Sequence, residues 1–160
     1  MNLQSYSKGL SVVEVVVGAT IILILTVAIA SAWKANLKVS RISNEKIQAA
    51  LLLEEAYEAI SYLRDGSWTS NILPLSLNTP YYLNWNGTTY IATTSTSTIQ
   101  NMYIRTVTFS SVIRDGQDNI SNSGIVDTKT RKVTISVSTN QNQPEVSVQA
   151  EMLIHNVFNN

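Results

Sequence analysis

The sequence predicts an α+β protein in which one long N-terminal helix packs on a C-terminal antiparallel sheet of about four or five strands. No charged residue occurs from Val15 to Trp33, which indicates a helix that is apolar on all sides. Neither proline nor glycine interrupts residues 19–65, so we expect this helix to continue well beyond the apolar run. From residue 81 onward, apolar and polar residues alternate with the period of two that is typical of β-strands.

The first part of the helix, residues 10–33, is long and apolar enough to span a membrane. Its uncharged run of about 19 residues corresponds to roughly 28 Å of helix, close to the thickness of the hydrocarbon core. Ala30-Ser31-Ala32 resembles a signal-peptidase site, but the apolar run is too long for an ordinary secretory signal. A retained membrane helix is therefore favoured over a cleaved one.

The second part of the helix, residues 34–66, is predicted to be amphipathic. Gly66 is expected to end it in a left-handed cap. An isolated coiled-coil stalk is the alternative, but the β-rich sequence that follows needs a helix to pack against. The apolar stripe consists of Val39, Ile42, Ala49, Leu53, Ala56, Ile60 and Leu63, at steps of three, four or seven.

The remaining residues, 67–160, are expected to form the sheet. An irregular connector precedes a β-hairpin at residues 81–94, with a type I′ turn at Asn86-Gly87. The loop that leads up to Asp127 is rich in Asp, Asn, Ser and Gly, which favour turns. The three later strands are expected at residues 102–113, 131–138 and 146–154.

The start of the helix carries the most informative motif. Lys8 and Gly9 precede the run Leu10-Ser11-Val12-Val13-Glu14, and Glu14 is the only acid before Glu45. A carboxylate at the border of a membrane-spanning segment is costly and indicates a functional residue. A basic residue, glycine, apolar residues, Glu at the fifth place and then an uninterrupted apolar helix resemble the class III signal of type IV prepilins and type II secretion pseudopilins.

The resemblance implies a subunit that is processed and then assembled. It implies a leader charged through Lys8, peptidase cleavage after Gly9 and methylation of Leu10, although Leu10 stands where phenylalanine is usual. Ser31 stands where many major pilins have a kinking proline, which implies a straighter helix. Glu14 is expected to neutralise the amine of a neighbouring subunit and fix the stagger between the two. The alternative for Glu14 is an acid that extends to the headgroups beside an ordinary anchor.

The partners and location that the resemblance implies are those of a filament subunit. The partners are other pilin subunits, prepilin peptidase, an inner-membrane assembly platform and, before assembly, membrane lipid. Residues 1–9 are then a cytoplasmic leader, and residues 67–160 an extracytoplasmic domain carried into a periplasmic or cell-surface filament. Lys34, Lys38 and Arg41 would place that domain in the cytoplasm by the positive-inside rule, and the leader resemblance outweighs them. The alternative is a single-span membrane protein with an extracytoplasmic binding domain that never assembles.

A second, shorter resemblance lies at the end of the helix. Glu54, Glu55 and Glu58 are followed by Arg64-Asp65 and then Trp68. This run is similar to one in PilV-like minor pilins, which implies a minor pilin or pseudopilin. Trp68 is equally expected to cover the C-terminus of the helix, and both interpretations hold together.

No catalytic motif is found, and neither an enzyme nor a cofactor is expected. His155 is the single histidine and falls on the polar phase of the last strand, where an exposed residue is the simpler interpretation. The chain has a net charge of zero, so no nucleic acid contact is predicted. It has no cysteine, which excludes disulfides and cysteine-based metal sites.

Three weaker candidates lie in the β-rich region. Oxygen-bearing residues in the 115–127 loop suggest calcium, but the loop lacks EF-hand spacing and a closing glutamate, so a solvated turn is favoured. Asn86 and Asn119 have the spacing of glycosylation acceptors. The aromatic residues Tyr81, Tyr82, Trp85 and Tyr90 are expected either to form an exposed surface for a partner or carbohydrate, or to cover the core.

Overall fold

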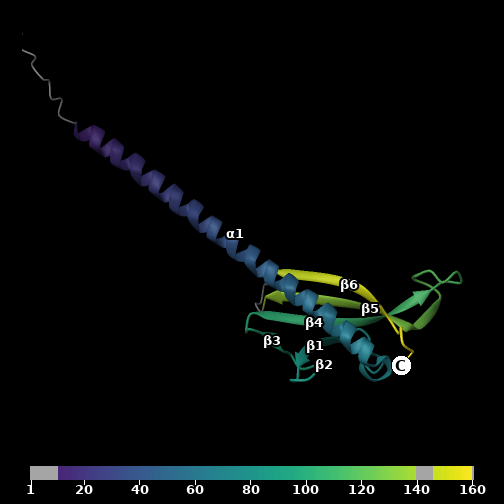
Figure 1. The fold of residues 1–160 in the computed structure, drawn as a ribbon. Coiled ribbons are helices and arrows are strands. Elements are labelled where there is room, and N and C mark those ends of the chain that lie inside the picture. The colour runs from purple at the N-terminus through teal and green to yellow at the C-terminus, as the bar shows by residue number, and fades with distance from the viewer. Residues whose placement is uncertain (1–10, 140–145, 160) are drawn as a thin grey trace, which may run out of the picture. The chain divides into compact units, whose positions relative to one another are not determined.

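A computed structural model describes residues 11–139 and 146–159, and the predictions for Lys8, Gly9, Leu10 and the turn at residues 140–144 lie outside them. The predicted α+β class is confirmed: a long N-terminal helix is followed by an antiparallel sheet (Figure 1). The chain divides into two compact units, Met1–Arg41 and Ile42–Asn160. The elements are α1 (Val12–Gly66), the π-helical turn η1 (Trp68–Ile72), β1 (Pro80–Trp85), β2 (Tyr90–Thr93), β3 (Thr98–Ile99), β4 (Tyr103–Arg114), β5 (Ile125–Thr139) and β6 (Ser147–His155).

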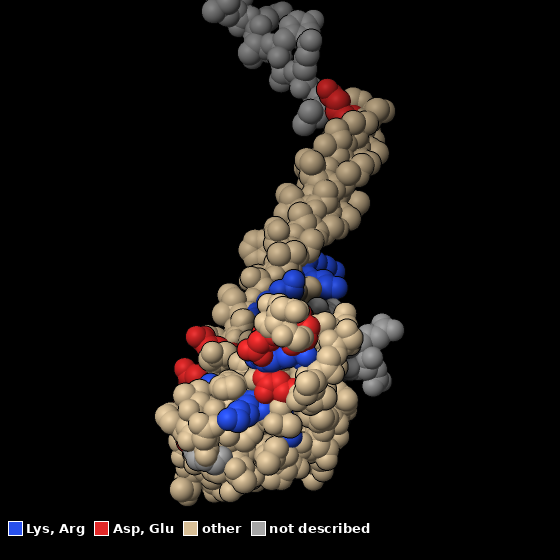
Figure 2. All heavy atoms as spheres, turned by 90° about the vertical axis from the view of Figure 1, so that its right-hand side faces the viewer, with Lys and Arg blue, Asp and Glu red and all other residues tan. Residues whose placement is uncertain are grey.

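The first unit contains the apolar part of α1. Its large apolar side chains are exposed throughout residues 12–33, and Figure 2 shows this stretch as a surface without Lys, Arg, Asp or Glu beyond its first turn. Thr20, Thr26 and Ser31 each donate a 2.8 Å hydroxyl hydrogen bond to the carbonyl four residues earlier. These hydroxyls are therefore satisfied inside the helix, as a hydrocarbon environment requires. By length and composition α1 is able to cross a membrane.

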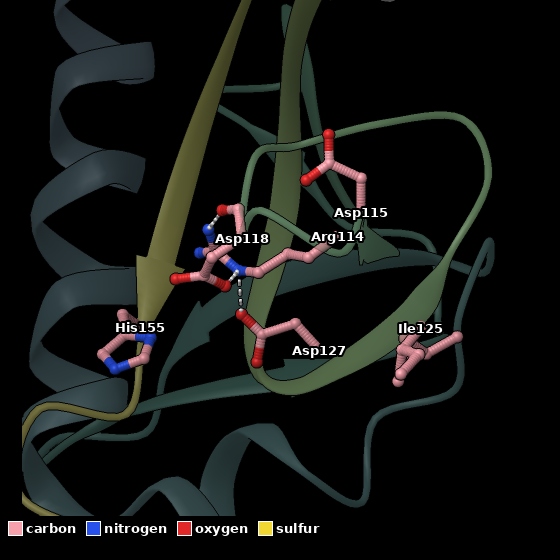
Figure 3. A pocket seen from close by; sticks show the side chains of 7 residues that line it. Arg114, Asp115, Asp118, Ile125, Asp127 and His155 are labelled. Atoms are coloured by element: carbon pink, nitrogen blue, oxygen red, sulfur yellow. Dashed lines mark hydrogen bonds and ion pairs between the residues drawn. The ribbon is translucent and has the colours of Figure 1, made fainter.

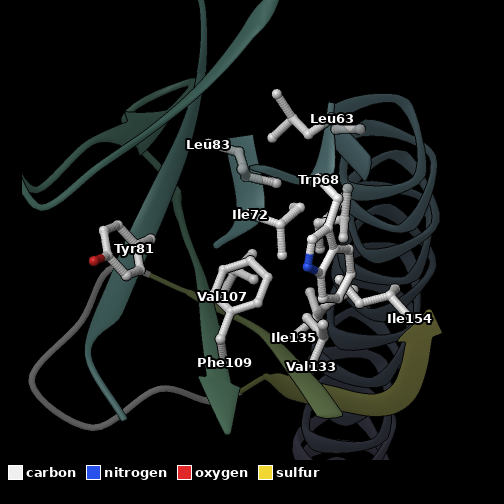
Figure 4. Packing of buried hydrophobic residues seen from close by; sticks show 13 residues of the cluster. Leu63, Trp68, Ile72, Tyr81, Leu83, Val107, Phe109, Val133, Ile135 and Ile154 are labelled. Atoms are coloured by element: carbon white, nitrogen blue, oxygen red, sulfur yellow. The ribbon is translucent and has the colours of Figure 1, made fainter. Parts of the chain in front are cut away.

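The second unit is built around a small-residue face of α1. Ala49, Ala56 and Ala59 are buried on this face. Ile60 and Leu63 continue this face, so the predicted stripe is confirmed for its C-terminal part. Figure 4 shows the main core, whose sheet side consists of Tyr81, Leu83, Val107, Phe109, Val133, Ile135 and Ile154.

The sheet has six antiparallel strands in the order β2-β1-β4-β5-β6, with β3 paired to β4. The register of β4 and β5 shifts between Ser111 and Val112, whose partners are Arg131 and Asp127. Residues 128–130 therefore have no partner in β4 and form a bulge in the β4–β5 ladder. Beyond the bulge pairing resumes, which is why β5 begins before the strand expected at residues 131–138.

The predicted type I′ turn of the first hairpin is wrong. Trp85 pairs with Tyr90, so the loop contains the four residues 86–89. The side-chain oxygen of Asn86 accepts hydrogen bonds from the N–H groups of Thr88 at 3.0 Å and Thr89 at 2.9 Å. The asparagine side chain thus closes a wider loop than a two-residue turn.

The predicted left-handed cap at Gly66 is also wrong. Gly66 is the last residue of α1, and its φ does not lie in the left-handed region. The carbonyl of Leu63 instead accepts hydrogen bonds from Asn71 Nδ2 at 2.9 Å and from the Ser67 N–H at 3.3 Å. A Cβ on Gly66 would lie 3.3 Å from Asn71 Nδ2, so glycine leaves room for this side-chain cap.

The expected irregular connector begins with an ordered turn. The Ser67 hydroxyl accepts a 3.2 Å hydrogen bond from the Ser70 N–H and caps η1. Trp68 and Ile72 of this turn are buried in the core. Arg131 of β5 donates hydrogen bonds of 2.8–2.9 Å to three carbonyls of the connector, which ties it to the sheet.

Arg105 is a charged residue in the buried phase of β4, and the sequence analysis did not single it out. Its side chain is 4% exposed, and Nη1 lies 3.1 Å from both Glu55 Oε1 and the Leu52 carbonyl oxygen of α1. Nη2 lies 3.5 Å from the Leu83 carbonyl oxygen of β1. One guanidinium therefore links α1, β1 and β4.

Replacing Phe109 by alanine should strongly destabilise the second unit. Its ring is fully buried between α1 and the sheet, so truncation leaves a cavity and should cost about 3–5 kcal/mol of unfolding free energy. Urea denaturation of the full chain measures this loss. Val157→Ala, at an exposed position, is the control and should change stability by about 0.5 kcal/mol or less. Equal losses of unfolding free energy in the two variants would contradict the assignment of Phe109 to the core.

Candidate functional site

The predicted assembly residue, Glu14, makes a contact within its own chain. Its carboxylate oxygen Oε2 accepts a 3.1 Å hydrogen bond from the Ser11 N–H. The Ser11 carbonyl in turn accepts a 3.2 Å hydrogen bond from the Val15 N–H, which makes Ser11 the N-cap of α1. Ser11-Val12-Val13-Glu14 has the spacing of a capping box, a signal that is readable from the sequence but is not among the predictions above.

This position stabilises the first turn of α1 in two ways. The carboxylate satisfies a backbone N–H at the helix start, and its negative charge lies at the positive end of the helix dipole. Glu14 remains exposed. An ionised carboxylate accepts more than one hydrogen bond, so the contact to Ser11 leaves capacity for a second donor.

A polar recess lies where β4 and β6 end and β5 begins, and Figure 3 shows it from close by. The recess measures about 390 Å³. Beside it, the bulge of β5 brings together several side chains that are linked by hydrogen bonds. Arg114 Nε donates to Asp127 Oδ2 at 2.8 Å, and the Thr130 hydroxyl donates to the same oxygen at 2.6 Å. His155 Nδ1 lies 2.9 Å from that hydroxyl. The lining residues are Arg114, Asp115, Asp118, Ile125, Val126, Asp127 and His155.

The hydrogen bonds explain the acidity of Asp127. The Thr130 hydroxyl, followed by the Arg114 guanidinium, lowers the pKa of Asp127 to about 2. The Lys129 N–H adds a 2.9 Å hydrogen bond to the other oxygen. Asp127 is therefore a fixed anion that joins the bulge to the end of β4.

The chain of side chains is not arranged for nucleophilic catalysis. In a hydrolase triad the histidine lies between the hydroxyl and the carboxylate and removes the hydroxyl proton. Here Thr130 lies between Asp127 and His155, and its hydroxyl proton is directed at Asp127. His155 is exposed on β6, as the sequence predicts, and assists no nucleophile in this geometry.

Asp115 of the 115–127 loop binds the backbone of the loop. Asp115 Oδ1 accepts hydrogen bonds from the N–H groups of Gln117 at 3.0 Å and Asn119 at 2.9 Å, and these bonds lower the pKa of Asp115. Within residues 11–139 and 146–159, no group of three or more His, Cys, Asp or Glu is placed to hold a metal ion. The turn interpretation of the loop accounts for its composition.

The four aromatic residues of the first hairpin differ in exposure: Tyr81 is buried, Tyr82 and Tyr90 are half-buried, and Trp85 is exposed. Tyr81 is buried and packs edge-on against Phe109 with ring centres 6.2 Å apart, so it belongs to no exposed surface. Trp85 is 58% exposed and lies edge-on to Tyr90 at 5.1 Å. The Tyr90 hydroxyl donates a 3.2 Å hydrogen bond to Glu55, and burial together with the Glu55 charge raises the pKa of Tyr90.

No family model, curated protein or solved structure matches the chain. The functional assignment therefore depends on the residues and on their geometry. Two features stand out in the described residues: the exposed apolar part of α1 with Glu14 at its start, and the aromatic residues Trp85 and Tyr90 beside α1.

Asp127→Asn should reduce the loss of stability in acid. The folded pKa of Asp127 lies below the unfolded value of 3.8, so its contribution is present above about pH 4 and is lost as the pH falls through about 2. We expect the wild type to lose about 1 kcal/mol more than the variant between pH 5 and 2.5, after discounting for solvent screening. Urea denaturation at both pH values measures the difference.

Glu54→Gln serves as the control for this experiment, because its side chain is exposed on α1 and lies outside the polar recess. It should lose as much stability in acid as the wild type. A variant at Asp127 that also loses as much as the wild type would contradict the assigned hydrogen bonds.

Proposed function

We propose that the protein is a minor pilin or pseudopilin, a membrane-anchored subunit of an extracytoplasmic type IV pilus-like filament. The exposed apolar surface of α1 over residues 12–33 is the observation that carries this proposal. Such a surface requires an apolar covering. Lipid covers it before assembly, and the corresponding helices of neighbouring subunits cover it afterwards.

The N-terminal motif supports processing before assembly. Prepilin peptidase cuts between Gly9 and Leu10, which removes the leader with Lys8 and leaves the apolar helix at the new N-terminus. Leu10 then carries the free or methylated amine. The β-rich domain faces away from the cytoplasm and forms the surface with which the filament meets its surroundings.

Glu14 has two roles in this proposal. It holds the first turn of its own helix through the Ser11 N–H. Its remaining acceptor capacity receives the amine of a neighbouring subunit, because a charge left unpaired in an apolar bundle is strongly penalised. This pairing selects one stagger between adjacent helices.

A second candidate is a single-span membrane protein that never assembles. The capping contact favours it, because that contact gives Glu14 a purpose within one chain. The two candidates differ in their N-termini and in their dependence on the Glu14 charge, and the next two predictions separate them.

Co-expression with a prepilin peptidase should yield a mature chain that begins at Leu10. Removing nine residues from 160 leaves 151, which intact mass and N-terminal sequencing identify. Gly9→Leu should block the cut, whereas Gly18→Ala should be cut normally, because a Cβ at Gly18 has nothing within 4 Å. A chain that still begins at Met1, or one that begins beyond Ala32, would favour the non-assembling anchor.

Glu14→Gln and Glu14→Ala should both be cleaved normally, and both should enter filaments at least tenfold less than the wild type. Glutamine at this position retains the capping interaction but carries no charge, so it isolates the charge from the cap. Immunoblots of sheared filaments and of the membrane fraction measure incorporation. If the glutamine variant enters filaments normally and the alanine variant does not, Glu14 acts as a helix cap and its charge is not needed for assembly.

A further inference from the structure

The second unit contains an aromatic recess between α1 and the β1–β2 hairpin. It measures about 400 Å³ and is lined by Glu58, Ala59 and Tyr62 of α1 and by Trp85 and Tyr90 of the hairpin. Tyr62 and Trp85 are 57% and 58% exposed, which is unusual for such large apolar side chains. This recess is separate from the apolar helix on which the filament proposal depends.

The hairpin wall of the recess is held in place by contacts outside it. The rings of Trp85 and Tyr90 meet at 64°, so they form two adjoining walls. The Tyr90 hydroxyl donates to Glu55 Oε1, and the same oxygen lies 3.1 Å from Nη1 of the buried Arg105. The Tyr90 side of the recess is thus held in place before any ligand enters, which reduces the entropic cost of binding.

The charges around the recess select a cation. The faces of three aromatic rings carry negative electrostatic potential, and Glu58 adds a carboxylate at the rim. None of the described residues that line the recess is basic. An anion would therefore be repelled, and a cation gains an attraction that a neutral group of the same shape lacks.

The hydrogen-bonding groups narrow the ligand further. The Tyr90 hydroxyl is already bonded to Glu55, which leaves the Glu58 carboxylate, the Tyr62 hydroxyl and the Trp85 indole N–H as polar side-chain groups of the lining. A sugar has many hydroxyls, and a primary ammonium has three donors, so either would lose more hydrogen bonds to water than it regains here. A quaternary ammonium has no N–H donors and binds through ring faces and charge.

We propose that the aromatic recess binds a quaternary ammonium group of the choline class. Trp85, Tyr62 and Tyr90 contact the methyl groups, and Glu58 neutralises the charge. This site does not depend on filament assembly, so the proposal can be tested separately from the function proposed above.

Choline titration of the full-length protein tests the proposal. The protein is held in a polyoxyethylene detergent, which contains neither sugar nor ammonium, and the indole N–H signal of Trp85 is followed by NMR and identified by its loss in Trp85→Leu. We expect a saturable shift with choline, and at least fivefold weaker binding of 3,3-dimethyl-1-butanol, its neutral counterpart of the same shape. Glycerophosphocholine, which has the structure of a lipid headgroup, is titrated in parallel. Tighter binding of glycerophosphocholine than of choline would identify a lipid headgroup as the ligand, and tighter binding of choline would identify free choline.

Two pairs of variants separate the recess from general surface effects. Glu58→Gln and Tyr62→Leu should each weaken choline binding at least fivefold. Glu54→Gln and Tyr57→Leu, at exposed positions of the same helix outside the recess, should leave it unchanged. Equal binding of the neutral alcohol, tighter binding of maltose or N-acetyl-lysine methylamide, unchanged binding by Glu58→Gln, or no saturable shift would each overturn the proposal.

Discussion

The apolar surface of α1 over residues 12–33 is the constraint on which the rest of this structure depends. Burying apolar area is the largest favourable contribution to folding and association, and this stretch exposes its large apolar side chains along its whole length. Its hydroxyls bond to carbonyls of the same helix and so need no partner from outside. The segment is therefore suited to lipid or to a bundle of similar helices. Glu14, at its start, is the one charged residue of this stretch, and in either environment its carboxylate needs a partner or contact with water.

From Ile42 onward the same helix is amphipathic, with one side buried against the sheet. One helix therefore has an apolar surface in its first part and a face that packs on the sheet in its second part. Ala56 and Ala59 are buried against the sheet, whereas Glu54 is exposed. Arg105 lies in this interface with Glu55 and two backbone carbonyls as partners. A buried charge costs several kcal/mol unless it is paired, so these partners specify one way of seating the helix on the sheet.

Polar side chains at the far end of the sheet serve structure more than chemistry. Asp127 receives hydrogen bonds from Arg114, Thr130 and a backbone N–H, which anchor the bulge of β5. His155 extends this chain of contacts without being placed to activate a hydroxyl. The recognition capacity of the second unit lies instead in the aromatic recess beside Glu58, where exposed rings and an acid occur together.

The long helix, the α+β class and the later strands could be predicted from the sequence, because they follow from local periodicity. The capping box at Ser11 was equally readable, since it requires only residues three apart. Strand pairing and packing were needed to establish that Tyr81 belongs to the core, that the hairpin loop spans residues 86–89, that residues 128–130 bulge from the β4–β5 ladder and that Trp85 joins α1 to form a recess. These features depend on pairing between segments distant in sequence, which local patterns of polarity do not encode.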